Sequence, residues 1–558
     1  MTQAKTLDLV FLWHMHQPDY RDPETGEYAA PWVYLHALKD YTDMAAHFER
    51  HPRAHAVVNF APILLEQIED YCRQFESGAF RDPLLRLLGH ENLDALSSAE
   101  RALVFEQCFH ANRSTMIDPF PQYRRLRDLY ERADSTGPVT LGYFSGAMLG
   151  DLLTWYHLAW TGETERRGRP LVAELLAKGE GFTLDERLRL RSLIGEVLQG
   201  IVPRYRALAA RGQLELSATP YSHPLAPLLI DFASAHDALP DAPLPVAAAY
   251  PGGRERVRAH LALAAASHAE RFGAAPAGIW PAEGAVSGAL IELLAETRCQ
   301  WAATSASVLA NSLGAARTAG DPYHAYRLDG VGGPALFFRD ERLSDLIGFE
   351  YSTWNGKDAA AHFVGELNAI PSEPGSSTPL LASVILDGEN AWEHFPFNGF
   401  YFFEELYRLL ETRQDVRTTT YREWLAANGT TVRPLARLVS GSWVHGSFST
   451  WIGSPDKNGA WDLLSAAKSA YDRSAAHLSA EARERAGKIL LGCESSDWFW
   501  WFGDQHPARA VSAFDKLFRS NLRALYRALG EEPPASLFEP VSHGKAADAP
   551  VATMLRAS

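Results

Sequence analysis

The chain has 558 residues, 46% of them hydrophobic and 22% charged, which is typical of a globular protein large enough for more than one domain. Its formal net charge of -15 argues against nucleic acid as a partner, because phosphate backbones demand clustered Lys and Arg. The four cysteines are widely spaced without a CxxC pair, the N-terminal apolar stretch is too short for a secretory signal, and no apolar run reaches bilayer length. We therefore expect a cytoplasmic protein without a membrane partner.

Short apolar runs suited to buried parallel strands alternate with longer segments whose apolar residues recur at helical spacing. The runs lie at residues 9–13, 54–60, 214–216, 278–280, 300–304, 335–338 and 380–386. Seven strands with intervening helices predict a fold of the α/β class, a closed or nearly closed β/α barrel. We place this barrel within residues 1–415.

Two further parts of the chain are predicted to be helical. Residues 65–212, between the second and third strands, carry helix-spaced apolar positions and read as a helical insertion. After residue 415 we expect no strands, and amphipathic segments predict a helical C-terminal domain over residues 416–540. Residues 541–558 resemble a flexible tail.

The first predicted strand runs into the polar sequence HMHQP. Side chains two positions apart on a strand point to the same side, so His14 and His16 should face one place. That place could hold a sugar, with Gln17 and Pro18 shaping the turn beside it. It could also hold a metal ion, if further ligands converge on the pair.

Carboxylates occur at three of the other strands. Glu215 interrupts an apolar strand, Glu283 follows the strand stopped by Pro281, and an unbroken apolar strand runs directly into Asp387. The chemistry of α/β barrels lies at the carboxyl ends of their strands, so Glu283 and Asp387 should share one rim. Two such acids are what glycoside cleavage requires. A single acid at a strand end is more often a helix N-cap, so the pairing carries this interpretation.

Aromatic residues beside these acids favour a sugar site. Trp280 precedes Glu283 by three residues, and Trp392 follows Asp387 by five. The segments SGSWVHGSFSTWIGSPDKNGAWD and CESSDWFWWFGDQH add more aromatic side chains among Gly, Ser and Asp. Aromatic rings can stack on pyranose faces, but those of the second segment could equally pack the helical domain against the barrel.

Five sequence segments resemble, in order, the conserved regions of glycoside hydrolase family 57. They are HMHQP, GQLEL, GIWPAEG, LDGENAWEHFPFNG and GSWVHGSF, and the resemblance extends from about residue 7 to 525. It implies a (β/α)7 barrel followed by a helical domain that helps to form the cleft, and a retaining mechanism without a metal or other cofactor. By motif position, Glu283 matches the nucleophile and Asp387 the general acid/base. The expected sugar-binding residues are His14, His16, Gln17, Glu215, Trp280, Glu389, Trp392, Trp443, His445 and Trp498.

The resemblance implies an enzyme of the α-amylase type that hydrolyses α-1,4-glucans or maltooligosaccharides. The DGEN segment is similar to the amylase and amylopullulanase side of the family and differs from the branching enzymes. One departure is that Ser305 and Ala306 stand where related members often carry an acidic pair.

Three alternatives stay open at this point. The first is a 4-α-glucanotransferase that uses the same site. The second is a metal-dependent amidohydrolase, in which Asp387 and His223 would complete a site around His14 and His16. The third is a glucan-binding protein with lost catalysis, which the replaced acidic pair at Ser305 would explain.

Overall fold

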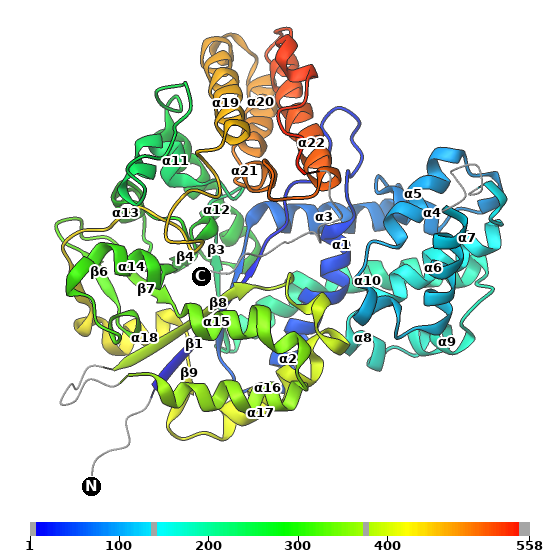
Figure 1. Ribbon diagram of the computed structural model, residues 1–558, viewed down its shortest axis with the longest axis horizontal. Helices are drawn as coiled ribbons and strands as arrows, with labels where there is room; N and C mark the ends of the chain where they lie inside the picture. Colours follow the sequence, from blue (N-terminus) through cyan, green and yellow to red (C-terminus); the bar gives the residue numbers. More distant parts are fainter. Residues whose placement is uncertain (1–6, 135–141, 372–378, 546–558) are drawn as a thin grey trace.

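The computed structural model describes residues 7–134, 142–371 and 379–545, and its centre is a barrel of seven parallel strands (Figure 1). Each strand pairs in parallel with the next, and the last, β8, pairs with β1 again, so the sheet closes on itself. All seven predicted strands are present, and the predicted α/β barrel is confirmed. The strands are β1 (Leu7–Met15), β2 (Ala56–Phe60), β3 (Leu214–Ala218), β4 (Gly278–Ile279), β5 (Trp301–Ser305), β7 (Ala335–Arg339) and β8 (Leu380–Asp387).

Three short strands join the sheet outside the barrel. β6 (Tyr326–Leu328) pairs with β7 and with β10 (Arg433–Leu435), and β9 (Val416–Thr418) pairs in parallel with β1. The expectation that no strand follows residue 415 is therefore wrong. Strands of three residues are too short to show the apolar run or the alternation by which a strand is recognised in a sequence.

Aromatic side chains close one end of the barrel. Tyr421 and Trp424, from α18 (Tyr421–Asn428), pack on the rings of Trp301 and Phe337 inside the sheet. Because Trp301 begins β5, these two aromatic residues cover the amino-terminal end of the strands. The opposite, carboxyl-terminal end is the one that remains for chemistry.

Helices surround the barrel and follow its strands in the chain. Many begin with a side-chain cap that the sequence supplies: Ser305 caps α14, for example, and Thr420 caps α18 with Glu423 closing a capping box. The helices of this layer are α1 (Trp32–His36), α2 (Thr42–Arg50), α3 (Pro62–Ser77), α11 (Ala226–Ile230), α12 (Gly253–Phe272), α13 (Gly288–Ala295), α14 (Ala306–Leu313), α15 (Glu341–Asp345), α16 (Gly356–Glu366), α17 (Phe400–Thr412) and α18.

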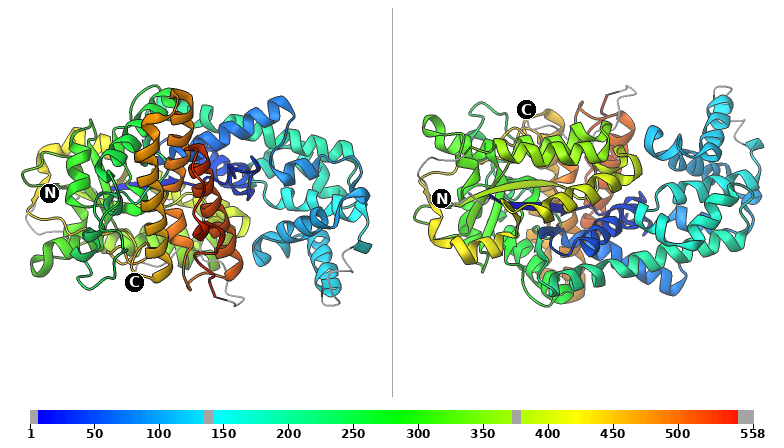
Figure 2. Two further views of the ribbon diagram at one scale, coloured as in Figure 1. Left: turned by 90° about the horizontal axis from the view of Figure 1, so that it is seen from above. Right: turned by 90° about the horizontal axis from the view of Figure 1, so that it is seen from below.

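A group of helices lies to one side of the barrel, between β2 and β3 in the chain, as all three views show (Figures 1 and 2). Its described residues form helices throughout the stretch where the sequence predicts them. The division of the chain into domains stays a prediction. The group consists of α4 (Pro83–Leu88), α5 (Ser98–Cys108), α6 (Pro121–Asp134), α7 (Gly146–Ala159), α8 (Glu163–Gly168), α9 (Pro170–Lys178) and α10 (Leu184–Ala210).

The C-terminal helices stand over the carboxyl-terminal side of the barrel, at the top of Figure 1. They are α19 (Pro455–Ser474), α20 (Ala480–Cys493), α21 (Asp497–Trp501) and α22 (Ala508–Ala528). Residues 541–545 of the predicted tail are packed, not loose, because Ser542 is buried and bonds to Asp515 and Asp456. Residues 546–558 lie outside the described residues. Among the helices of the described ranges, none is both long enough and apolar enough to cross a membrane.

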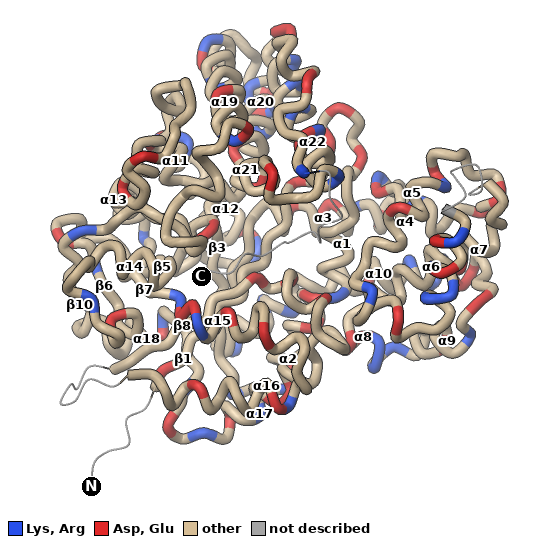
Figure 3. The backbone as a smooth tube through the Cα atoms, viewed as in Figure 1, with Lys and Arg blue, Asp and Glu red and all other residues tan. Residues whose placement is uncertain are grey.

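Acidic and basic residues are interspersed along the backbone of the helices, both in the inserted group and in the C-terminal one (Figure 3). In this view, the basic residues of the described part of the chain do not gather into the continuous stripe that binds a nucleic acid backbone.

Candidate active site

A cavity of about 1280 Å³ opens at the carboxyl-terminal end of the barrel strands. Three parts of the chain line it: the strand ends, the inserted helices and the C-terminal helices. The second part contributes the stretch from Phe105 to Asn112 with Tyr130 and Trp160, and the third contributes Asp497, Trp500, Trp501 and much of α22. Residues that are far apart in the sequence therefore meet around one space.

Glu283 and Asp387 both line this cavity. Asp387 is the last residue of β8. Glu283 lies just beyond β4, in a turn where its φ angle is 60°. A positive φ in a residue other than glycine costs of the order of 1 kcal/mol, and such strain is typical of functional sites. The turn is held by Trp443, whose backbone nitrogen donates to the main-chain oxygen of Glu283 at 3.0 Å.

Burial raises the pKa of both acids. Desolvation raises the pKa of Glu283 to about 8, and the negative charges of Asp387 and Asp497 add to the shift. Desolvation also raises the pKa of Asp387, to about 6, although Asn390 and His16 act in the opposite direction. Between these pH values the pair of carboxyl groups holds one proton. One protonated and one ionised carboxyl group is the state that glycoside cleavage needs.

Three histidines form a stack on the floor of the cavity. The rings of His14 and His16 lie 5.8 Å apart, as expected for side chains on one side of a strand, and the ring of His223 lies 3.8 Å from that of His16. His223 comes from the loop after β3, with a φ angle of 61°. Burial, with His16 nearby, lowers the pKa of His14 to about 3, so His14 is neutral at pH 7. The outermost ring, His16, donates from Nε2 to the carboxylate of Asp497 at 2.9 Å.

These residues fit a metal ion poorly. The ligand atoms of His16, His223 and Asp497 lie within 4.8 Å of one another, so Asp497 stands in the place that the metal interpretation gave to Asp387. However, the His16 and His223 rings are parallel within 12° and stacked face to face. Because the lone pair of an imidazole nitrogen lies in its ring plane, the lone pairs run side by side and do not converge on one point as tetrahedral ligation requires.

Glu389 and Gln17 form a second polar wall of the cavity. Gln17 donates to Glu389 Oε1 at 3.3 Å and accepts from the hydroxyl of Tyr20 at 3.1 Å. Glu389 Oε2 is buried without a hydrogen-bond partner among the described residues. Desolvation, with the charges of Asp387 and Asp40, raises the pKa of Glu389 well above its ordinary value. A buried carboxyl group with a free oxygen in a cavity is suited to bind a hydroxyl group.

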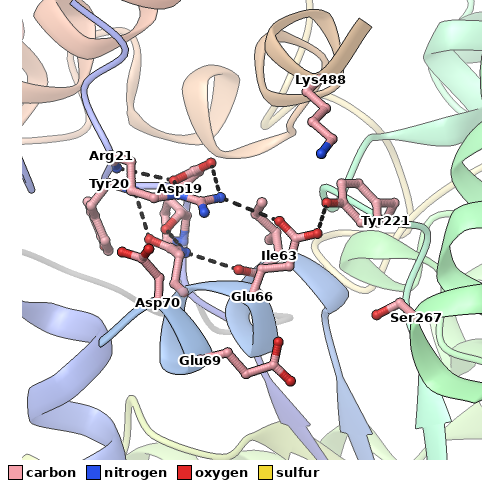
Figure 4. Close-up of polar contacts among 12 residues, drawn as sticks. Asp19, Tyr20, Arg21, Ile63, Glu66, Glu69, Asp70, Tyr221, Ser267 and Lys488 are labelled. Atoms are coloured by element: carbon pink, nitrogen blue, oxygen red, sulfur yellow. Dashed lines mark hydrogen bonds and ion pairs between the residues drawn. The ribbon is translucent and has the colours of Figure 1, made fainter. Parts of the chain in front are cut away.

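A polar network behind the HMHQP turn fixes its position (Figure 4). Gln67 of α3 accepts from the backbone nitrogen of Tyr20 and donates to the carbonyl of Pro18, at 3.0 and 2.9 Å. In Figure 4, Glu66 lies between Arg21 and Tyr221: it forms an ion pair with Arg21 and accepts from the hydroxyl of Tyr221. The loop after β1 is thereby joined to the loop after β3, which carries His223.

Seven of the residues predicted for the site line the cavity, namely His14, His16, Gln17, Glu283, Asp387, Glu389 and Trp443. Glu215 does not. It lies at the start of β3, inside the barrel, where it accepts from Trp301 Nε1 at 2.7 Å and from the backbone nitrogen of Arg422 at 2.9 Å. The Glu215 carboxylate therefore binds the first turn of α18 at the closed end of the barrel, and the prediction of sugar binding for it is corrected. The reason is that it sits at the beginning of its strand, not at the carboxyl end.

Three predicted tryptophans pack beneath or beside the site without lining the cavity. Trp280 lies edge-on to Trp443 at 5.3 Å, Trp392 packs on Trp13 and Phe403, and Trp498 packs on Phe518. The indole nitrogens of Trp392 and Trp498 are used on backbone carbonyls. These side chains support the site from outside the cavity, and the expectation that they contact sugar stays a prediction.

The last predicted residue, His445, is exposed and does not line the cavity. Its backbone adopts a φ of 56° within the loop that presents Trp443. The DWFWW segment divides by helix face: Trp498 and Phe499 are buried, whereas Trp500 and Trp501 line the cavity. Trp498 and Phe499 therefore pack the helical domain, whereas sugar binding by Trp500 and Trp501 stays a prediction.

Arg339 and Asp497 are among the charged residues of the cavity that sequence reasoning missed. Arg339 ends β7, donates to Asp345 at 2.7 Å, and lies 5.7 Å from the ring of Trp443. The rule that polar residues at strand ends mark the site would have found it. Asp497 had no such signal, because it comes from the C-terminal helices and only the fold brings it to His16.

The replaced acidic pair has a structural explanation. Ser305 is fully buried, caps α14 by accepting from the backbone nitrogen of Val308 at 3.2 Å, and donates to the carbonyl of Ser442 at 3.1 Å. It therefore supports the loop that carries Trp443, while Glu283 and Asp387 keep their places at the cavity.

The sequence profile of glycosyl hydrolase family 57 matches residues 10–435, which is more than half of the chain. The chain belongs to glycosyl hydrolase family 57. The resemblance to this family is confirmed, with the first four of the five motifs inside the matched residues, and the protein is a glycoside hydrolase. No curated protein matches the chain.

Several solved structures share the fold. A branching enzyme of this family from Pyrococcus horikoshii has 16% identity and a TM-score of 0.59, with 95% of this chain and 93% of that chain covered. An α-amylase from Thermotoga maritima has 13% identity and a TM-score of 0.55, with 96% and 95% covered. A 4-α-glucanotransferase from Thermococcus litoralis has 14% identity and a TM-score of 0.51, with 94% and 60% covered. At such identities the likeness extends to the fold alone.

Proposed function

We propose that this family 57 enzyme hydrolyses α-1,4-glucans, in the manner of an α-amylase, by a double displacement that retains configuration. The observation that carries the proposal is the meeting of Glu283 and Asp387 at one cavity, with their charges coupled. An α-amylase and a 4-α-glucanotransferase are among the proteins of similar fold, and their names denote α-glucan chemistry. The tryptophans and phenylalanines of the cavity wall offer flat faces for sugar rings.

In the first step, protonated Asp387 donates its proton to the glycosidic oxygen while Glu283 attacks the anomeric carbon. The bond to the leaving sugar breaks, and a glycosyl ester on Glu283 forms. In the free enzyme, burial favours the shared proton on Glu283, whose pKa is the higher of the two. The proton therefore has to move to Asp387 as the positive charge of the sugar develops next to Glu283.

In the second step, ionised Asp387 takes a proton from an incoming hydroxyl group, which attacks the same carbon and releases Glu283. Water as the acceptor gives hydrolysis, and a sugar hydroxyl gives transfer. The second candidate function is therefore a 4-α-glucanotransferase. The breadth of the cavity favours it, because Trp500, Trp501 and Tyr130 extend the aromatic wall beyond the strand ends, where an acceptor chain can bind.

The test is a product profile from a single linear maltooligosaccharide. Hydrolysis yields only shorter chains, whereas transfer also yields longer ones. Glu283→Gln should abolish either pattern, and Glu296→Gln, at an exposed glutamate paired with Arg258, is the matched control. The proposal fails if Glu283→Gln retains the wild-type rate, or if the wild-type enzyme leaves linear and branched α-glucans unchanged.

A further inference from the structure

A chain of polar contacts connects Glu283 to a buried asparagine on the far side of the histidine stack. Ser496 Oγ is within reach of two acceptors: it can donate to Glu283 Oε1 over a long 3.5 Å, and it lies 2.9 Å from His223 Nδ1. His223 Nε2 lies 3.1 Å from His14 Nε2, and His14 Nδ1 lies 2.7 Å from Asn59 Oδ1. Asn59 and Ser496 are fully buried, and the two imidazoles are almost so.

At Asn59, the direction in which protons are donated along this series of hydrogen bonds is defined. Asn59 Oδ1 faces His14 and also accepts from the hydroxyl of Thr219 at 2.8 Å, while its amide nitrogen donates to Ser217 at 3.0 Å. An amide oxygen can only accept, so His14 carries its proton on Nδ1. Since His14 is neutral, its Nε2 has a free lone pair.

The same direction of proton donation continues through His223 and Ser496. His14 Nε2 accepts, so His223 must donate from Nε2. Burial also keeps His223 neutral, by lowering its pKa well below the ordinary value, and its Nδ1 is left as an acceptor. The hydroxyl of Ser496 then donates to His223 Nδ1, which is the nearer of its two possible acceptors. A serine hydroxyl has one proton, so none remains for Glu283.

We propose that Asn59 is a positioning residue. It sets the direction of proton donation along this series of hydrogen bonds, so that the Ser496 hydroxyl points its proton away from Glu283. Glu283 Oε1 then stays free of a donor from this side, and only Oε2 is held, by Trp443 Nε1 at 3.0 Å. The inference rests on the proposed function, in which Glu283 is the nucleophile. A hydrogen bond to the attacking oxygen would have to be broken during attack, so its absence favours the reaction.

The decisive variant is Asn59→Asp, which keeps the shape but introduces a negative charge beside His14. A charged imidazole on His14 would donate from both nitrogens, so His223 would accept at Nε2 and donate from Nδ1. The hydroxyl of Ser496 would then turn to Glu283. We expect kcat to fall about 10- to 100-fold, the range of one hydrogen bond to a charged group, with little change in KM.

A second variant distinguishes an effect of hydrogen-bond direction from a structural effect of the Asn59 substitution. In the double variant Asn59→Asp with Ser496→Ala, the reversed hydroxyl is gone, and the N–H at His223 Nδ1 lies 3.9 Å from Glu283 Oε1, too far for a hydrogen bond. We expect kcat to recover to within about threefold of Ser496→Ala alone. A purely structural role of Asn59 would give no such rescue. Thermal unfolding of each variant shows whether it is folded, and a double variant that is folded but no more active than Asn59→Asp would overturn the proposal.

A measurement on the wild-type enzyme avoids the folding question. Nitrogen NMR of ¹⁵N-histidine protein, assigned with single His variants, reports which nitrogen carries the proton. We expect Nδ1–H on His14 and Nε2–H on His223, and Nδ1–H on His223 would overturn the proposal. Because this readout needs no substrate, the direction of the chain can be confirmed even if the enzyme fails to cleave α-glucans, so the two proposals fail separately.

Discussion

Trp443 holds Glu283 at two points, because its backbone nitrogen donates to the main-chain oxygen of Glu283 and its indole Nε1 donates to Oε2, both at 3.0 Å. The two residues are 160 positions apart in the chain. The main-chain bond stabilises the turn in which Glu283 adopts a positive φ. The side-chain bond orients the carboxyl group and opposes the rise of its pKa that burial causes.

The change Trp443→Phe tests the side-chain bond alone. The aromatic ring and the main-chain bond stay, but the N–H donor is lost. We expect kcat to fall about 10- to 100-fold, and the alkaline limb of the pH profile to move to higher pH, because a donor that lowers the pKa of Glu283 is gone. Trp354→Phe, at an exposed tryptophan outside the cavity, is the control. An unchanged pH profile in Trp443→Phe would contradict the role of the indole.

The pH dependence of the wild-type enzyme follows from the two raised pKa values. Below about pH 6 both Glu283 and Asp387 are protonated and the nucleophile is lost, and above about pH 8 both are ionised and the acid is lost. We therefore expect a bell-shaped profile of kcat/KM between these values. In Asp497→Asn a charge that raises the pKa of Glu283 is removed, so the alkaline limb should move to lower pH. Asp504→Asn, at an exposed position nearby, should leave both limbs in place.

The barrel could be predicted from the sequence because its strands are short, largely apolar runs, of which β5, β7 and β8 end in a polar residue. The same rule located Glu283 and Asp387, because the carboxyl ends of parallel strands meet at one rim. It misplaced Glu215, since an acid inside a short run does not reveal at which end of the strand it lies. Asp497 and Ser496 could not be located, because their places depend on how the C-terminal helices pack on the barrel, and no local pattern encodes that.

Burial of Glu283 should cost stability at neutral pH. Its pKa is about 8 in the folded protein and 4.5 as the ordinary value, so the unfolded chain loses the proton first as the pH rises. The free energy of unfolding therefore falls between pH 4.5 and 8. Glu283→Gln removes this cost, and we expect it to be more stable than the wild type by about 3 kcal/mol at pH 7. Chemical denaturation at pH 5 and pH 7 checks this, and a gain that is equal at both pH values would refute it.

Activity should not depend on a metal ion, because the stacked rings of His16 and His223 do not converge on one ligand position. We expect dialysis against EDTA to leave kcat/KM on a maltooligosaccharide unchanged within about twofold. Elemental analysis of the purified enzyme is the companion measurement. Loss of activity on chelation, with recovery on addition of one divalent metal, would instead favour the metal-dependent interpretation of the histidine pair.

The C-terminal segment that brings Ser496 and Asp497 to the site is anchored by the neighbouring Glu494, which is fully buried. Arg256 of α12 donates to both of its carboxylate oxygens, at 2.6 and 2.7 Å, and His260 contacts Oε2 at 2.8 Å. Burial alone would raise the pKa of Glu494, but His260 and Arg256 outweigh it and lower the pKa to about 2. The stabilisation is therefore complete above pH 4.5 and is lost as the pH falls towards 2.

Glu494→Gln leaves the partly buried Arg256 without its counter-charge, and we expect a loss of about 3 kcal/mol in the free energy of unfolding at pH 7. The loss should shrink as the pH falls from 4.5 towards 2, because the unfolded wild-type chain then takes up a proton at Glu494 that the folded protein does not bind. Glu174→Gln removes an acid from the exposed ion pair with Arg189 and should cost less than about 1 kcal/mol. Equal effects of the two substitutions in urea denaturation would show that Glu494 does not anchor the segment, and the approach of Ser496 to Glu283 would then need another cause.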